Sequence, residues 1–327
     1  MRILSCVVKL SLATIVVLCL VSLVSVHAQQ TDIPQPSPTP VKKKDDNVEI
    51  VNVDLVSLTV TVFDQYGRAV TGLSKEAFTV FDNDEKQKIT NFSDDDSPVT
   101  VGVVFDLSGS MSGDKIKRAR EALKKFIDTS HEQDEYLLIG FNSRAQLLVD
   151  KTRDGDAILN KLTFVNPKST TALYDACYLG VEKVLRGTHK KRALLIISDG
   201  QDNNSRYTFN ELKRLLKETD VTIYTIGILG GGDFGSSLGM LGQSYLEEMS
   251  SVTGGKTFFP NSSEEMDDAF YRIAVELRHQ YSIGYIPLNF TNNGKYHKIK
   301  VKVAPPRGMP RLNVRTKEGY YALTNPK

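Results

Sequence analysis

Five residues in three distant segments of the chain carry side-chain oxygen atoms that could bind one metal ion. They are Asp106, Ser108, Ser110, Thr171 and Asp199. Asp106 directly follows the apolar run 101–105, and Asp199 follows the run 193–197 after one serine; both runs are typical of strands buried on both faces. Open parallel sheets bind ligands at the edge where such strands end. Carboxylates and hydroxyls form an all-oxygen set, which suits Mg²⁺, Mn²⁺ or Ca²⁺ and is poor for zinc or copper.

Helix capping is the alternative role for the first of these segments. An aspartate and two serines at alternate positions before a helix can simply accept hydrogen bonds from free backbone N–H groups. A single copy of such a motif is therefore weak evidence for a metal site. The order and context of all three segments together favour the metal site.

The stretch 99–278 resembles a von Willebrand factor type A (VWA) domain. The metal-ion-dependent adhesion site (MIDAS) of that family is written Asp-x-Ser-x-Ser, then Thr, then Asp, and no element is missing here. The matching residues are, in order, Asp106, Ser108 and Ser110, then Thr171, then Asp199. The resemblance implies that both serines coordinate through hydroxyls and that the aspartates act partly through waters. It also implies that Thr171 coordinates directly mainly when a ligand is bound.

The same resemblance implies a protein-binding site with an open coordination position on the ion. A glutamate or aspartate from a partner protein fills that position, and Mg²⁺ accepts an added carboxylate readily. The loop with Gly232, Asp233 and Phe234 follows the predicted fifth strand of the domain and should emerge at the same edge. We interpret it either as a rim that selects the partner or as a flexible connection. Asp175 and Asp202 are nearby, and we expect them to cap, pair or order loops.

Two rival classes of function are a metal-assisted hydrolase and a structural module with a non-functional site. The nucleophile elbow of a serine hydrolase, Gly-x-Ser-x-Gly, is absent, because residues 109–113 have methionine where the serine is needed. No general base is evident beside the ion. The histidines after the leader fall in predicted helix ends, basic turns or a lysine-rich strand: His131, His189, His279 and His297. We therefore expect a binding module and no enzyme.

The first 28 residues have the pattern of a secretory signal peptide. Arg2 and Lys9 precede an apolar stretch from residue 10 to 26, and Val26 and Ala28 are small residues that a signal peptidase reads. An uncleaved membrane anchor is the alternative, although the stretch is somewhat short for a membrane span. In both cases the rest of the chain is expected outside the cytoplasm, periplasmic or secreted.

Charge and composition restrict the partners of the chain. The formal net charge of +2 comes from Arg2 and Lys9, so the chain without its leader is near neutral. Nucleic acid is an unsuitable partner, because it requires a clustered basic surface. Apolar residues make up 40%, enough for a substantial core. After the leader only Cys177 remains, and its apolar helical pattern predicts a small buried hydrophobe and no intramolecular disulfide.

Hydrophobic periodicity divides the rest of the chain into a proline-rich linker, two β segments and an α/β domain. The predicted bounds are 29–47 for the linker, 48–98 and 279–327 for the β segments, and 99–278 for the VWA domain. Strands of the domain are expected at 101–105, 136–141, 145–149, 193–197, 221–229 and 256–259. Its helices are expected at 116–126, 173–185, 209–217, 245–251 and 263–279. This alternation predicts a doubly wound, mostly parallel sheet with helices on both faces, and the resemblance implies strand order 3-2-1-4-5-6.

The two flanking β segments are each too small to be stable alone. We therefore predict that they pair into one small β-sandwich beside the α/β domain. Asn293 and Gly294 favour a hairpin turn before the alternating strand 298–303. This order of segments, including the closing Gly-Tyr-Tyr, resembles exported bacterial proteins of the VWFA-related family.

Overall fold

The computed structural model of the protein describes residues 55–163, 170–229, 236–288 and 293–322. All of them belong to one compact unit. The predicted signal peptide and linker, and the loop residues Gly232, Asp233 and Phe234, lie outside the described residues. Within the described part of the chain, no helix has both the length and the apolar character that crossing a bilayer requires.

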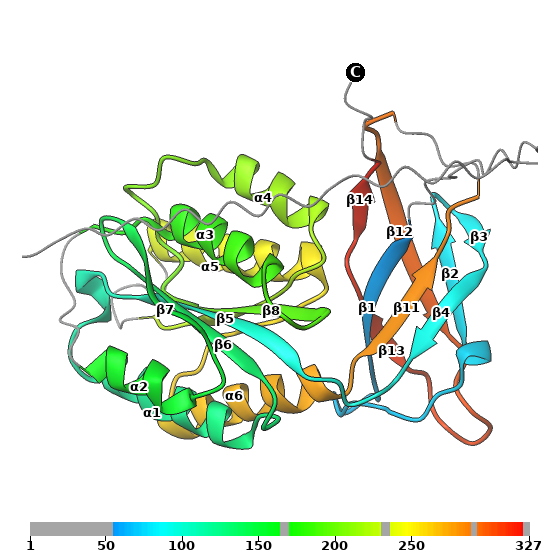
Figure 1. Ribbon diagram of the computed structural model, residues 1–327, viewed down its shortest axis with the longest axis horizontal. Helices are drawn as coiled ribbons and strands as arrows, with labels where there is room; N and C mark the ends of the chain where they lie inside the picture. The colour runs from blue at the N-terminus through cyan, green and yellow to red at the C-terminus, as the bar shows by residue number, and fades with distance from the viewer. Residues whose placement is uncertain (1–54, 164–169, 230–235, 289–292, 323–327) are drawn as a thin grey trace, which may run out of the picture. The chain divides into compact units, whose positions relative to one another are not determined.

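A six-stranded sheet, in the order β10-β9-β8-β5-β6-β7, forms the centre of the α/β domain (Figure 1). Its strands are Val99–Asp106 (β5), Glu135–Phe141 (β6), Ala145–Thr152 (β7), Lys191–Ser198 (β8), Thr222–Gly227 (β9) and Thr257–Phe258 (β10). All neighbours pair in parallel except β7, which runs antiparallel to β6 at one edge. Numbered within the domain, the order is 3-2-1-4-5-6, which confirms the doubly wound sheet.

Helices cover both faces of this sheet because its central strands are apolar on both sides. Along β5, Val103 and Phe105 belong to one hydrophobic core, and Val104 between them belongs to the other. The first core is closed by Asp114–Thr129 (α1), Gly155–Thr163 (α2) and Ser263–Arg278 (α6). The second is closed by Leu173–Leu185 (α3), Phe209–Glu218 (α4) and Ser237–Thr253 (α5). Figure 1 shows the two sets of helices on opposite sides of the sheet.

Two helices differ from the prediction. Helix α2 was not expected, although Ile158 and Leu162, one turn apart, are both fully buried in it. Helix α5 begins at Ser237, well before the predicted start at residue 245, because Ser236 caps it by accepting a hydrogen bond from the Gly239 N–H. The expected burial of Cys177 in α3 is confirmed.

Two antiparallel four-stranded sheets combine strands from the chain segment before the α/β domain with strands from the segment after it. Their orders are β13-β1-β11-β4 and β14-β12-β2-β3. The N-terminal strands are Val56–Phe63 (β1), Phe78–Asp82 (β2), Glu85–Gln87 (β3) and Ile89–Ser93 (β4), with the 3₁₀ turn Lys75–Ala77 before β2. The C-terminal strands are Tyr281–Tyr285 (β11), Tyr296–Val303 (β12), Asn313–Arg315 (β13) and Gly319–Tyr321 (β14). Each sheet takes strands from both flanks, which confirms the shared sandwich, while the exact domain bounds given above stay predictions.

Alternating apolar residues of the two flanks form a common core between these sheets. Leu58 pairs with Ile283 across β1 and β11, and Val80 pairs with Val301 across β2 and β12. The hairpin predicted at Asn293 is wrong: β11 and β12 belong to different sheets, and β12 pairs with β2 and β14 instead. The flanks are therefore held together by long-range pairing.

A fragment of residues 48–98 is expected to be largely unfolded in isolation. Strands β1 and β2 would lose their partners β11 and β12, and with them one half of the sandwich core. Far-ultraviolet circular dichroism with a thermal melt measures this directly. The fragment 99–278, with its two closed cores, is the control and should melt cooperatively. A cooperative melt of the 48–98 fragment would contradict the shared sandwich.

Candidate metal centre

The two candidate aspartates lie side by side at the carboxyl edge of the central sheet. Strands β5 and β8 are parallel neighbours, with Phe105 opposite Ile197. Asp106 is the last residue of β5, and Asp199 directly follows β8. The strand order reverses between these two strands, which is where open α/β sheets form a crevice for ligands. Two residues far apart in the chain are thereby brought to one site.

Asp106 is completely buried at the end of its strand. Its Oδ1 accepts the backbone N–H of Ser108 at 2.8 Å, and its Oδ2 accepts the Ser198 hydroxyl at 2.6 Å. Burial raises the pKa of Asp106 to about 6, and the negative charge of Asp199 adds to this effect against the hydrogen bonds from the serines. A positive charge at the site would stabilise the ionised carboxylate.

Asp199 has one carboxylate oxygen that the protein does not satisfy. The side chain is 1% exposed, and Oδ1 accepts the Gln201 N–H at 3.0 Å. Oδ2 is buried without a hydrogen-bond partner in the described part of the chain. An unpartnered buried polar atom is unfavourable, and such atoms in native proteins generally mark a bound ion, a water or a functional site. The orphaned oxygen fits a cation at this edge.

The hydroxyls of Ser108 and Ser110 form an adjacent pair of possible ligands. Their Oγ atoms are 2.9 Å apart, and Ser108 is buried while Ser110 is exposed. Two oxygen ligands at neighbouring corners of an octahedron around Mg²⁺ are also about 2.9 Å apart, given metal–oxygen distances of about 2.0–2.1 Å. Neither serine caps α1, whose N-cap residue is Gly113, and Ser108 makes no side-chain cap to the 3₁₀ turn Gly109–Met111. The geometry therefore favours the metal interpretation over capping.

Thr171 is tied to the loop that carries Asp199. Its backbone N–H donates to Asn203 Oδ1 at 2.9 Å, and its carbonyl oxygen accepts the N–H groups of Asn203 and Asn204, both at 3.0 Å. Thr171 itself is buried and lies just before α3. These bonds hold the third segment of the motif against the second.

Asp202 and Asp175 order the neighbouring loops, as expected. Asp202 Oδ2 accepts the Tyr174 N–H at 3.0 Å, at the start of α3, and the Ser205 hydroxyl at 2.6 Å. Asp175 accepts the Arg206 N–H at 2.9 Å and pairs with its guanidinium at 3.2 Å. Both carboxylates are committed to these contacts.

The chemistry of the set fits a hard divalent cation. Among the residues described, no group of three or more His, Cys, Asp or Glu side chains forms a metal cluster. The candidate centre contains only two carboxylates, and hydroxyls supply the other oxygens, which is a ligand type for Mg²⁺ or Ca²⁺. The structure brings Asp106, Ser108, Ser110 and Asp199 to this edge and anchors Thr171 to it.

Ser198, Gly200 and Gly242 contribute to the site and were missed from the sequence. Ser198 donates to Asp106, as described above. Gly200 has a positive φ of 83°, and a Cβ there would lie 2.4 Å from the Gly242 carbonyl oxygen on α5. The loop after Asp199 is thus packed against α5 with no space for a side chain. The Ser-Asp-Gly order around Asp199 could have indicated Ser198 and Gly200 from the sequence, whereas nothing in the sequence pointed to Gly242.

The von Willebrand factor type A domain model matches residues 101–272, just over half of the chain. The chain therefore belongs to the von Willebrand factor type A domain family.

Several known proteins resemble this chain at low identity. An uncharacterized protein of Synechocystis is 25% identical over 176 residues, which are 52% of this chain and 39% of that protein. Inter alpha-trypsin inhibitor heavy chain 4 of Mus musculus is 25% identical over 198 residues, 56% of this chain and 20% of that protein. The chain therefore spans well under two thirds of the length of these relatives. A structure of proximal thread matrix protein 1 from the mussel byssus, with a zinc-occupied MIDAS motif, has 18% identity and a TM-score of 0.47, covering 59% of this chain and 48% of that one.

Proposed function

We propose that this protein is an extracytoplasmic protein-binding module, for adhesion or scaffolding, and that a divalent cation at its MIDAS accepts an acidic side chain of the partner. Asp106, Ser108, Ser110, Thr171 and Asp199 are the proposed metal residues. Mg²⁺ is the first choice of cation, with Mn²⁺ or Ca²⁺ as alternatives. The observation that carries the proposal is the orphaned Asp199 Oδ2 beside the buried carboxylate of Asp106 and the serine pair.

Some residues of the site are proposed to bind the cation, and others leave one side of it open to a ligand. Asp106 and Asp199 supply negative charge from the ends of two rigid, buried strands. Ser110 is exposed, so the site is accessible from solvent on that side. When bound, the cation supplies an electrophilic position that a carboxylate can occupy.

The proposed class is a binding module rather than an enzyme, because none of the histidines in the described residues lies at this edge as a general base. His131 and His189 precede β6 and β8 and so lie at the opposite, amino edge of the sheet. His279 follows α6, and His297 is in β12 and contacts Asp82. The proposed location outside the cytoplasm rests on the signal-peptide pattern of residues 1–28.

Capture of partners from an extracytoplasmic extract tests this function. Proteins retained in Mg²⁺ should be released by EDTA, and one particular Asp or Glu of the partner should be essential for retention. If ordinary surface charges held the partner instead, its binding would weaken smoothly with added salt and would persist in EDTA. Equal recovery of partners in Mg²⁺ and in EDTA would refute the proposal.

Replacement of Thr171 by alanine is expected to weaken partner binding about tenfold while leaving Mg²⁺ binding nearly unchanged. The threonine is proposed to act mainly when the ligand carboxylate is present. Calorimetry with Mg²⁺ and surface-immobilised partner binding separate the two affinities. Thr170→Ala, at the exposed neighbouring threonine, is the control. Equal loss of metal and partner affinity in Thr171→Ala would contradict this division of roles.

The loop with Gly232, Asp233 and Phe234 is proposed as a rim that selects the partner. Helix α5 begins directly after this loop, and three large apolar side chains near its start are exposed: Leu238, Met240 and Leu241. A partner surface with an apolar side chain beside its acidic residue matches this region. Phe234→Ala is expected to lower partner retention several-fold without changing the heat of Mg²⁺ binding. An unchanged partner affinity would remove the loop from the interface.

A further inference from the structure

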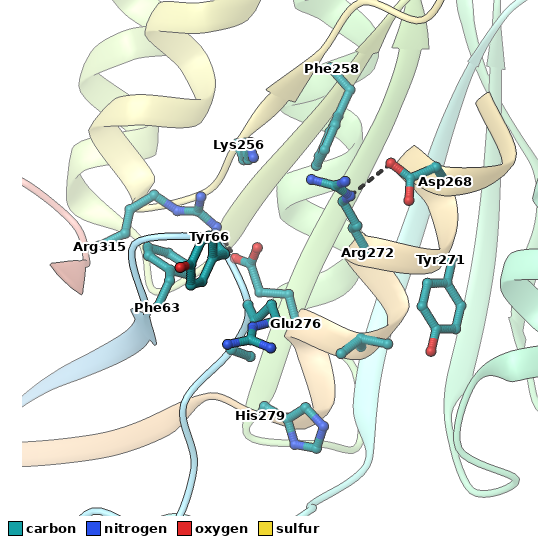
Figure 2. Close-up of a pocket in the computed structure, with 14 residues that line it drawn as sticks. Phe63, Tyr66, Lys256, Phe258, Asp268, Tyr271, Arg272, Glu276, His279 and Arg315 are labelled. Carbon is teal, nitrogen blue, oxygen red and sulfur yellow. Dashed lines mark hydrogen bonds and ion pairs between the residues drawn. The ribbon is translucent and has the colours of Figure 1, made fainter. Parts of the chain in front are cut away.

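A cavity of about 430 Å³ lies among the turn that follows β1, strand β10, helix α6 and strand β13 (Figure 2). Its size falls in the range of sites for small organic ligands. Its polar lining includes Arg68, Lys256, Asp268, Arg272, Glu276, His279 and Arg315. It shares no residue with the proposed metal centre.

The charges in this cavity leave one cation without a counter-charge. Arg272 pairs with Asp268 at 2.7 Å, and Arg68 pairs at 2.7 Å with Asp64, which lies outside the lining. Arg315 pairs with Glu276 and also donates from Nε to the Gly254 carbonyl oxygen at 2.8 Å. Lys256 forms no ion pair within the described residues. The cavity therefore has a local excess of one positive charge at Lys256.

The charges of two other cations of the lining, Arg315 and Arg272, act on the Lys256 ammonium. In the view of Figure 2 the label and side-chain end of Lys256 are drawn between these two residues. Lys256 is exposed as a residue, but partial desolvation of its ammonium group lowers its pKa, and the charges of Arg315 and Arg272 lower it further against the weaker opposite effect of Asp268. An anion beside Lys256 would relieve this repulsion, which makes the position suited to a negatively charged group.

Aromatic rings line the cavity, and one of them contacts this cation. The Lys256 Nζ lies 4.8 Å from the centre of the Phe258 ring, and the Arg315 guanidinium lies 4.8 Å from the centre of Phe63. Tyr66 and Tyr271 are 72% and 58% exposed at the cavity, so both rings can meet a ligand. Flat apolar surfaces next to one unpaired cation favour a flat apolar body that carries one anionic group.

We propose that this cavity binds a small organic monocarboxylate with a flat, apolar body, whose carboxylate pairs with Lys256. A phosphate dianion fits less well, because all three arginines of the lining that could provide a bidentate fork, Arg68, Arg272 and Arg315, already pair with carboxylates of the protein. The site stands independently of the metal centre.

Titration of the purified protein with 2-naphthoate, followed by ligand-observed NMR, tests the site. The neutral isostere 2-naphthamide and inorganic phosphate are the comparison probes. Naphthoate is expected to bind at least about tenfold more tightly than naphthamide, the range of a hydrogen bond to a charged group. Lys256→Gln should remove that difference. Lys300→Gln, at an exposed lysine of β12, is the matched control and should keep it.

Tyr66→Ala supplies a second test that does not alter charge. Tyr66 is largely exposed, so the fold should be unaffected, while the loss of one wall should weaken naphthoate several-fold. The proposal is overturned if naphthamide binds as well as naphthoate, if Lys256→Gln leaves naphthoate affinity unchanged, or if neither naphthalene compound binds. Displacement of naphthoate by phosphate at equal concentration would overturn the assignment to a monocarboxylate.

Discussion

Replacement of Asp106 by alanine is expected to lower the affinity for Mg²⁺ by about 100-fold or more, since loss of groups that only support metal ligands already costs about 10–100-fold. Asp106 ends β5 beside Asp199, so the variant removes one of the two negative charges of the centre. Isothermal titration calorimetry with Mg²⁺, Mn²⁺ and Ca²⁺ measures the change. Asp114→Ala, at an exposed aspartate in the first turn of α1, is the matched control and should bind like the wild type.

Because Asp106 is buried and hydrogen-bonded, its alanine variant also leaves the Ser198 hydroxyl and the Ser108 N–H without their acceptor. Asp106→Asn keeps the shape and one acceptor oxygen, and so separates loss of charge from loss of fold. Saturating Mg²⁺ should stabilise the wild type by about 2.7 kcal/mol at a concentration 100 times the Kd, and should not stabilise Asp106→Asn. Equal binding heats for wild type and both variants would show that the metal assignment is wrong.

Replacement of Gly200 by alanine is expected to destabilise the protein by several kcal/mol and to weaken Mg²⁺ binding. The residue has φ of 83°, which costs a residue with a side chain about 1–2 kcal/mol. The added Cβ would also lie 2.4 Å from the Gly242 carbonyl oxygen, so the loop that carries Asp199 must move. Thermal unfolding and calorimetry report the two effects.

Gly72→Ala is the control for this substitution. Gly72 has φ of 73°, and a Cβ there would meet no atom within 4 Å, so only the backbone strain of about 1–2 kcal/mol should appear. Mg²⁺ affinity should be unchanged in this variant. If Gly200→Ala cost no more than Gly72→Ala and kept its Mg²⁺ affinity, close packing of the loop against α5 would not position the metal centre.

The central sheet could be predicted from the sequence because its strands are buried on both faces. Continuous apolar runs such as 101–105 and 193–197 stand out from amphipathic helices, and their alternation leaves few topologies. Helix α2 was missed because it is short, with buried apolar contacts chiefly from Ile158 and Leu162. The early start of α5 was missed because its first residues include glycine and expose Leu238 and Met240, which gives no helical face.

The sequence predicted that the two flanking β segments pair with each other, but it did not predict which strands pair. The marginal stability of each flank implies that the two must join, but no local signal tells which strands of Val56–Ser93 pair with which strands after Arg278. Asn293 and Gly294 are typical of a hairpin, yet the chain passes from one sheet to the other beside them. The local turn is present, since Gly294 has φ of 70° and the Lys295 N–H donates to Asn293 Oδ1 at 2.8 Å, but β11 and β12 join different sheets around a shared core.

The candidate metal residues could be predicted from their spacing in the sequence, whereas the residues that hydrogen-bond or pack against them could not. Asp106 and Asp199 were placed together because parallel strands end at one edge. The partners of these carboxylates, such as Ser198, and the backbone contact at Gly242 depend on three-dimensional packing. The cavity around Lys256 was also invisible in the sequence, because its lining comes from segments separated by most of the chain.

Diffraction from crystals soaked in Mn²⁺, recorded for its anomalous signal, tests the central claim most directly. We predict an anomalous peak at the carboxyl edge of β5 and β8, within about 2.0–2.6 Å of the Ser108 and Ser110 hydroxyl oxygens, the span of Mg²⁺ and Ca²⁺ distances to oxygen. The peak should be absent from crystals of Asp106→Asn. A wild-type crystal at saturating Mn²⁺ without a peak at this edge, or with an equal peak in Asp106→Asn, would contradict the account.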